Sequence, residues 1–146
     1  MTQRHFVQND HRMLVTTNTR DRRPVFADPV HAREAVEHLY RVQQEMPFCL
    51  FGFVIMPDHC HFLVYVPAPA TVSECMRTYK MGLTFQIGIG AFWQPRFHIR
   101  LVEDSSAALR YIHFNPVKAG LCENPEDYPW SSASGRWDVT ELGMVG

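Results

Sequence analysis

Apolar positions along the chain recur with the spacing of strands in some stretches and of helices in others. Strand-like runs, rich in β-branched and aromatic side chains, occupy residues 13–19, 48–56, 60–66 and 97–102. Helix-like spacing, with capping residues at its start, occupies residues 29–45, 71 to about 85, and 107 to about 114. The pattern therefore predicts four strands and three helices.

Turn residues separate these elements. Pro57-Asp58 lies between the second and third strands and predicts a hairpin, and residues 20–29, with two prolines, predict a loop. Because the residue before a proline avoids the helical region, Asn115-Pro116 is expected to end the last helix. Gly120 is then expected to close a short turn after it.

The order strand, helix, strand, strand, helix, followed by an edge strand and a helix, predicts an α+β fold. It fits a ferredoxin-like antiparallel sheet with its helices packed on one face. A chain of 146 residues, 46% of them apolar, is expected to form a single domain. The net charge is +3 over residues 1–120 and −4 over residues 121–146, and we expect a flexible acidic tail from about residue 134.

The composition indicates where the protein is located and which classes of partner it can have. The net charge of −1 argues against an indiscriminate nucleic-acid coat. The four cysteines form no C-x-x-C motif and are expected to be reduced thiols. The longest apolar run is about half of what would cross a bilayer, so no membrane association is expected. We expect a cytoplasmic protein.

His59-Cys60-His61 is the main candidate for chemistry. Side chains alternate along a strand, so two histidines two residues apart point to the same side and could share one metal ion. Cys60 and Phe62 would then face the core. The alternative is that both are ordinary strand histidines without a ligand.

A second candidate lies on the last helix. Tyr111 and Asn115 are four residues apart, which places a phenol and a carboxamide on one helical face. If that face covers the histidines, the site would combine a metal and a nucleophile near one phosphate. Alternatively Tyr111 is half-buried packing and Asn115 is a cap.

Basic and aromatic residues alternate before and within the fourth strand. Trp93, Arg96 and Arg100 are candidates for contact with single-stranded DNA, although the aromatic residues here could equally belong to the core. Arg110 and Lys118 flank the candidate nucleophile and could contact phosphates.

Three motifs together resemble a known family. Residues 54–64 (VIMPDHCHFLV), 93–97 (WQPRF) and 111–120 (YIHFNPVKAG) resemble the REP-associated tyrosine transposases, single-tyrosine transposases of the HUH nuclease superfamily. Residues 127–132 (DYPWSS) resemble that family's tail motif. The resemblance implies a ferredoxin-like nuclease fold that cleaves single-stranded DNA beside palindromic repeats that form hairpins.

Carried over by position, the resemblance implies a role for each candidate. His59 and His61 would bind a divalent metal, Mg²⁺ or Mn²⁺, with Asn115 as a third ligand. Tyr111 would form a 5′-phosphotyrosine intermediate. A monomer is favoured over a dimer, and the protein would associate with the nucleoid when bound to DNA.

Two other functions stay open on sequence grounds. The chain could be a domesticated hairpin-binding protein that no longer cuts, or a ferredoxin-like metalloenzyme that acts on a small molecule. A hairpin-binding protein that no longer cuts would have no physical reason to keep both histidines and Tyr111. The second leaves the spacing of Tyr111 and Asn115 unexplained.

Overall fold

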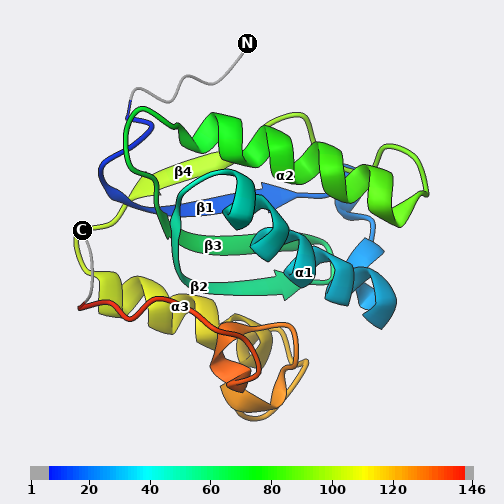
Figure 1. Cartoon of the computed structure of the whole chain (residues 1–146). Coiled ribbons are helices and arrows are strands. Elements are labelled where there is room, and N and C mark those ends of the chain that lie inside the picture. Colours follow the sequence, from blue (N-terminus) through cyan, green and yellow to red (C-terminus); the bar gives the residue numbers. More distant parts are fainter. Residues whose placement is uncertain (1–6, 144–146) are drawn as a thin grey trace.

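The computed structural model describes residues 7–143 and contains one antiparallel sheet in the order β2-β3-β1-β4 (Figure 1). In chain order the main elements are β1 (Arg12–Asn18), α1 (Pro29–Glu45), β2 (Cys49–Met56), β3 (His59–Tyr65), α2 (Val72–Ile87), β4 (His98–Leu101) and α3 (Ser105–Lys118). Four short 3-10 helices are η1 (Arg20–Arg22), η2 (Val25–Ala27), η3 (Pro125–Asp127) and η4 (Ser132–Ser134).

The strand order confirms the predicted α+β, ferredoxin-like sheet. β1 and β2 each pair with β3 in the antiparallel direction, so they run parallel to each other and α1 makes the crossover between them. The other outer strand, β4, pairs with β1. None of the helices in the described part of the chain is long and apolar enough to span a membrane.

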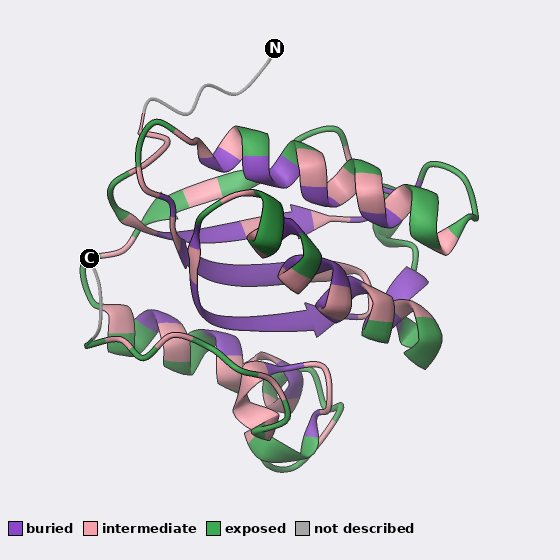
Figure 2. Cartoon of the chain, viewed as in Figure 1, coloured by how far each residue is buried: buried purple, intermediate pink, exposed green. Residues whose placement is uncertain are grey.

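The sheet is covered on both faces, which differs in part from the expectation. Helices α1 and α2 share one face and pack against side chains such as Met13, Phe53 and Phe62. α3 lies on the opposite face, against Leu14, Val54 and Leu63. The reason is visible in β2, which is buried along nearly its whole length (Figure 2). A strand that is apolar on both faces needs a layer on each side.

Capping residues set the helix starts. Asp28 accepts a hydrogen bond from the amide of Val30 at the start of α1, with Pro29 in the first turn. The Thr71 hydroxyl accepts from the amide of Glu74 at the start of α2. The Asp104 carboxylate accepts from the amide of Ala107 and so begins α3. These boundaries agree closely with those predicted from sequence.

The predicted end of α3 at Asn115 is wrong, since the helix continues through Pro116 to Lys118. A proline removes one amide donor but leaves its neighbours able to bond, and the amide of Ala119 still donates to the Asn115 carbonyl at 3.1 Å. After Lys118 the chain turns away at Gly120, whose positive φ of 76° permits the amide of Leu121 to donate to the Pro116 carbonyl. Asn115 is therefore a helical residue and not a cap.

The C-terminal segment covers the outer edge of β2. The Tyr128 hydroxyl donates to the Ile55 carbonyl at 2.6 Å, and the Ile55 amide donates to the Trp130 carbonyl at 2.8 Å. Further on, the amide of Thr140 donates to the Leu50 carbonyl at 2.8 Å, and the Trp137 indole donates to the Pro129 carbonyl at 2.8 Å. The tail expected to be flexible from about residue 134 is thus docked on the domain as far as it is described.

Ser132 links this segment to both β2 and α3. Its hydroxyl oxygen accepts from the Phe53 amide at 3.0 Å and lies 2.9 Å from Nε2 of His113 on α3. The Ser132→Ala variant leaves both groups without that partner. We expect the free energy of unfolding in urea to fall by about 1–3 kcal/mol.

The matched control for this stability prediction is Ser106→Ala, an exposed serine in the first turn of α3. Its unfolding midpoint should stay near that of the unmodified chain. Equal midpoints for Ser132→Ala and Ser106→Ala would show that Ser132 does not hold α3 in place.

Candidate active site

His59 and His61 lie at the start of β3, directly after the Pro57-Asp58 turn, and point to the α3 face. Their ring centroids are 4.8 Å apart. Cys60, between them, is fully buried on the other face, as the alternation along the strand predicts. The four cysteines are free thiols, also as expected.

Each of the two imidazoles is oriented by a hydrogen bond at its own Nδ1 atom. Nδ1 of His61 lies 2.8 Å from the Thr16 hydroxyl, because strand pairing places Thr16 opposite His61. Nδ1 of His59 lies 2.7 Å from the carboxylate of Asp58. Nε2 of each ring remains for a ligand, which is the arrangement typical of histidines that bind metals. The pair therefore fits a divalent cation.

The burial of His61 favours its metal-binding form. The side chain is 5% exposed, and this burial, together with the neighbouring His59, Arg22 and Arg100, lowers the pKa of His61 to about 4. A neutral imidazole keeps a lone pair for a cation. His61 is accordingly unprotonated at neutral pH.

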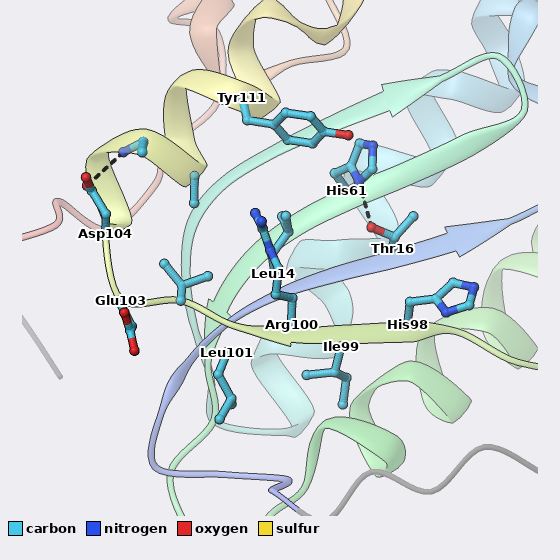
Figure 3. Close-up of a pocket in the computed structure, with 13 residues that line it drawn as sticks. Leu14, Thr16, His61, His98, Ile99, Arg100, Leu101, Glu103, Asp104 and Tyr111 are labelled. Carbon is cyan, nitrogen blue, oxygen red and sulfur yellow. Dashed lines mark hydrogen bonds between the residues drawn. The ribbon is translucent and has the colours of Figure 1, made fainter.

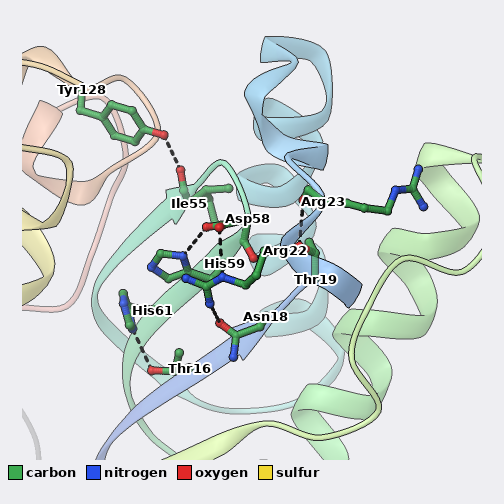
Figure 4. Close-up of polar contacts among 10 residues, drawn as sticks. All are labelled: Thr16, Asn18, Thr19, Arg22, Arg23, Ile55, Asp58, His59, His61 and Tyr128. Carbon is green, nitrogen blue, oxygen red and sulfur yellow. Dashed lines mark hydrogen bonds and ion pairs between the residues drawn. The ribbon is translucent and has the colours of Figure 1, made fainter. Parts of the chain in front are cut away.

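Asp58 is itself fixed by the loop after β1 (Figure 4). Arg22 Nε lies 3.1 Å from the Asp58 carboxylate, and Arg22 also donates to the Asn18 side chain at 2.8 Å. The amide and the hydroxyl of Thr19 both donate to the Asp58 carbonyl, each at 3.0 Å. These contacts join residues distant in sequence, so sequence reasoning did not find them. In the sequence, only the position of Asp58 directly before His59 indicated a contact between the two side chains.

Tyr111 extends from α3 toward His61 (Figure 3). Its ring centroid lies 5.4 Å from that of His61, and its side chain is 43% exposed. Ala108 and Ile112, buried on the same helix, pack against the sheet and set this position. The structure thus brings together the phenol and the imidazoles that the sequence analysis placed in one site.

The predicted third metal ligand, Asn115, lies one turn after Tyr111 and is partly exposed. Across residues 7–143, no group of three or more His, Cys, Asp or Glu side chains is arranged to hold a metal ion. A third protein ligand would have to be of another type, and an amide oxygen is suitable. The role of Asn115 stays a prediction.

A groove of about 720 Å³ runs between α3 and β4 beside these residues. His61, Thr16 and His98 come from three adjacent strands and lie in one row across the sheet. Arg100, two residues after His98, rises from β4 into the same space (Figure 3). The groove therefore offers a cation beside Tyr111.

The other predicted DNA contacts lie at different distances from this groove. Lys118 is exposed two helical turns after Tyr111, on the same side of α3. Arg110 is exposed but lines a different hollow, with His113 and Phe114. Arg96 is exposed in the loop before β4. Of the predicted cations, Arg100 alone lines the groove.

Trp93 does not fit the predicted role of an open stacking surface. It is only 6% exposed, and its ring packs against Phe26 and Phe92 with centroids 5.5 and 4.9 Å away. The aromatic residues of this segment fill the core under α2, which the sequence analysis held open as the alternative. We therefore assign Trp93 to the core.

Comparisons with known proteins identify the family of this chain. A family model described as IS200-like transposase (Y1_Tnp) matches residues 7–115. The REP-associated tyrosine transposase of Escherichia coli (strain K12) is 30% identical over 122 residues, which cover 80% of this chain and 73% of that protein. A relative from Haemophilus influenzae is 28% identical over 109 residues, 61% of each chain.

A solved structure shares the fold over the full length. It is a REP-associated tyrosine transposase bound to a REP hairpin, with a TM-score of 0.78 and 24% identity, covering 100% of this chain and 96% of that one. The family match spans most of the chain and includes both histidines, Tyr111 and Asn115. This chain belongs to the REP-associated tyrosine transposases, within the IS200-like transposase family.

Proposed function

We propose that this protein is a metal-dependent single-stranded DNA endonuclease and strand transferase that acts beside hairpin-forming repeats. The observation that carries the proposal is the contact of the Tyr111 ring with His61, which in turn contacts His59. A helix and a strand distant in the chain hold a phenol beside two imidazoles, which supports a nucleophile acting next to a bound metal. A small-molecule metalloenzyme would have no need of that phenol.

His59, His61 and Asn115 are the side chains that would hold the metal, Mg²⁺ or Mn²⁺. When bound, such a cation supplies a Lewis acid that polarises a phosphate and offsets charge in the transition state. Thr16 and Asp58 keep the two rings oriented for this. Imidazole also suits transition metals, so the purified protein could bind them more tightly than Mg²⁺.

Tyr111 would act as the nucleophile. Its hydroxyl oxygen forms a bond to the scissile phosphorus, and the bond from that phosphorus to the 3′ oxygen breaks. The phenolic proton goes to solvent, which reaches the half-exposed side chain, and the departing 3′ oxygen takes a proton from water. The product is a 5′-phosphotyrosine with a free 3′-hydroxyl. Since the new phosphodiester keeps the energy of the old one, strand transfer needs no ATP.

The cations near this site would hold the DNA backbone. Arg100 lines the groove and is the first contact that we propose, with Lys118 and Arg96 further along and Arg110 on the outer side of α3. The hairpin is the proposed partner because a relative of the same fold is bound to one. We propose a monomer as the working form and the cytoplasm, on nucleoid DNA, as its place.

The first test is covalent trapping. The protein, incubated with Mn²⁺ and a pool of single-stranded hairpin DNAs, should give a protein-DNA adduct that resists detergent. Tyr111→Phe should abolish the adduct while hairpin binding persists, since only the attacking oxygen is removed. Tyr65→Phe, on β3, is the matched control and should form the adduct. Cleavage by Tyr111→Phe, or DNA binding by an unmodified protein that forms no adduct, would contradict the proposal.

The metal site is tested by calorimetric titration with Mn²⁺. We expect His59→Ala and His61→Ala each to abolish measurable binding, because two ligands remain at most. Asp58→Ala should weaken binding by about 10–100-fold, since it removes the partner that orients His59. His11→Ala, an exposed histidine elsewhere, should bind normally. Equal affinities in all four variants would place the metal elsewhere.

The role of Arg100 is tested by the salt dependence of binding. Loss of one phosphate contact from Arg100→Ala should weaken binding to single-stranded DNA and reduce the slope of log affinity against log salt by about 0.7. Arg33→Ala on α1 makes the same charge change at an exposed residue far from the groove. If both variants have the same slope, Arg100 makes no phosphate contact.

A further inference from the structure

A second groove lies on the other face of the sheet, under α2. It has a volume of about 670 Å³ and runs between the later turns of α2 and the loop before β4. Its lining includes Arg77, Lys80, Met81 and Phe85 from α2, and Trp93 and Gln94 from the loop. Because α2 and α3 cover opposite faces, this groove and the Tyr111 groove are separate.

The outer wall of the second groove is apolar and open to solvent. Phe85 is 83% exposed and Met81 is 67% exposed, and the two lie one turn apart on α2. Two large apolar side chains this exposed beside a groove are typical of a surface that binds something. Trp93 lies behind them, with the Lys80 ammonium 5.6 Å from its ring centroid.

The charges around this groove favour an anionic ligand. Arg77 and Lys80 line it and Arg96 follows in the same loop, while none of the described residues that line it is acidic. Lys80 is engaged with the loop itself, donating to the carbonyls of Gln94 and Arg96 at 2.7 and 3.3 Å. Arg77 and Arg96 are both exposed. A second copy of this chain would bring the same cations face to face, which opposes self-association here.

One segment of chain connects this groove with the Tyr111 groove. Trp93, Gln94, Pro95 and Phe97 line the second groove, with Arg96 in the same loop, and residues 98–104 line the first. The strand between them, β4, is an edge strand, and no strand in the described part of the chain pairs with its outer side. A polynucleotide leaving the Tyr111 groove across β4 would therefore reach Arg96 and then Phe85.

We propose that this second groove binds an unpaired nucleotide of the same DNA strand that Tyr111 cuts. The base stacks on Phe85 and against Met81, and its phosphates contact Arg77 and Arg96. An exposed aromatic ring beside cations is the usual means of holding single-stranded nucleic acid. The inference rests on the proposed function for its ligand, and it assigns a contact outside the catalytic groove.

The experiment measures binding by fluorescence anisotropy in the full chain carrying Tyr111→Phe, so that no DNA is cut. Two probes share one hairpin, one blunt and one with a flank of about six unpaired nucleotides. Phe85→Ala should raise the dissociation constant of the flanked probe by about 5–100-fold, while that of the blunt probe stays the same. Phe85→Trp should keep the affinity for the flanked probe.

Val30→Ala is the matched control, because Val30 is a 69% exposed apolar residue on α1, away from both grooves. Unchanged binding of the flanked probe by Phe85→Ala would overturn the proposal, and a protein ligand for the groove would give that result. An equal loss for both probes would also overturn it, by showing contact with the paired stem.

The experiment distinguishes a failure of the groove assignment from a failure of the proposed cleavage. With Tyr111 present, the control Val30→Ala should form the covalent adduct as the unmodified protein does. If the unmodified protein forms no adduct while Phe85→Ala selectively weakens the flanked probe, the proposed cleavage fails and the nucleotide groove stands. If the adduct forms but the selective loss is absent, the groove assignment fails alone.

Discussion

The packing of α3 on the outer face of the sheet is the interaction on which the candidate site depends. Ala108 and Ile112 are buried against strands that carry apolar residues on both faces. This contact brings Tyr111 beside His61, although they lie far apart in the chain. If α3 packed with α1 and α2 on the other face, the phenol would be separated from the imidazoles by the thickness of the sheet.

The two imidazoles are more rigidly positioned than Tyr111. The imidazoles lie on a central strand, and each has a hydrogen-bond partner that is itself fixed, Thr16 by strand pairing and Asp58 by Arg22. Tyr111 is half-exposed on a helix at the surface. In the proposed metal site, two imidazoles that are fixed before the metal binds would lose little entropy on binding. As the proposed nucleophile, Tyr111 would keep the freedom to approach different substrates.

Much of the fold could be predicted from local sequence. Capping residues such as Asp28 and Thr71 act within one helical turn, so they marked helix starts closely. The end of α3 was missed because the rule for residues before a proline is a tendency, and Pro116 lies where few helical hydrogen bonds remain to be lost. The second covered face could have been inferred from β2, whose apolar run does not alternate.

The site was predicted unevenly for a physical reason. The histidine pair is a local motif, so its orientation followed from strand alternation. Tyr111 was singled out by its spacing to Asn115 and by family resemblance, whereas its distance to His61 depends on tertiary packing. Thr16 and Arg22 were not found, because their contacts require the pairing register and the loop conformation. For Trp93 the sequence left DNA contact and core packing open, because composition alone does not report burial, and the structure shows it buried.

The docking of residues 128–142 along β2 has a consequence for biosynthesis. The ribosome makes this segment after all four strands and α3, so the outer hydrogen-bonding edge of β2 is open until it emerges. A nascent chain stalled before Tyr128 would carry His59, His61 and Tyr111 but also a bare strand edge. Such an intermediate would be prone to aggregate, and quality control by chaperones and proteases would act on it before it could reach DNA.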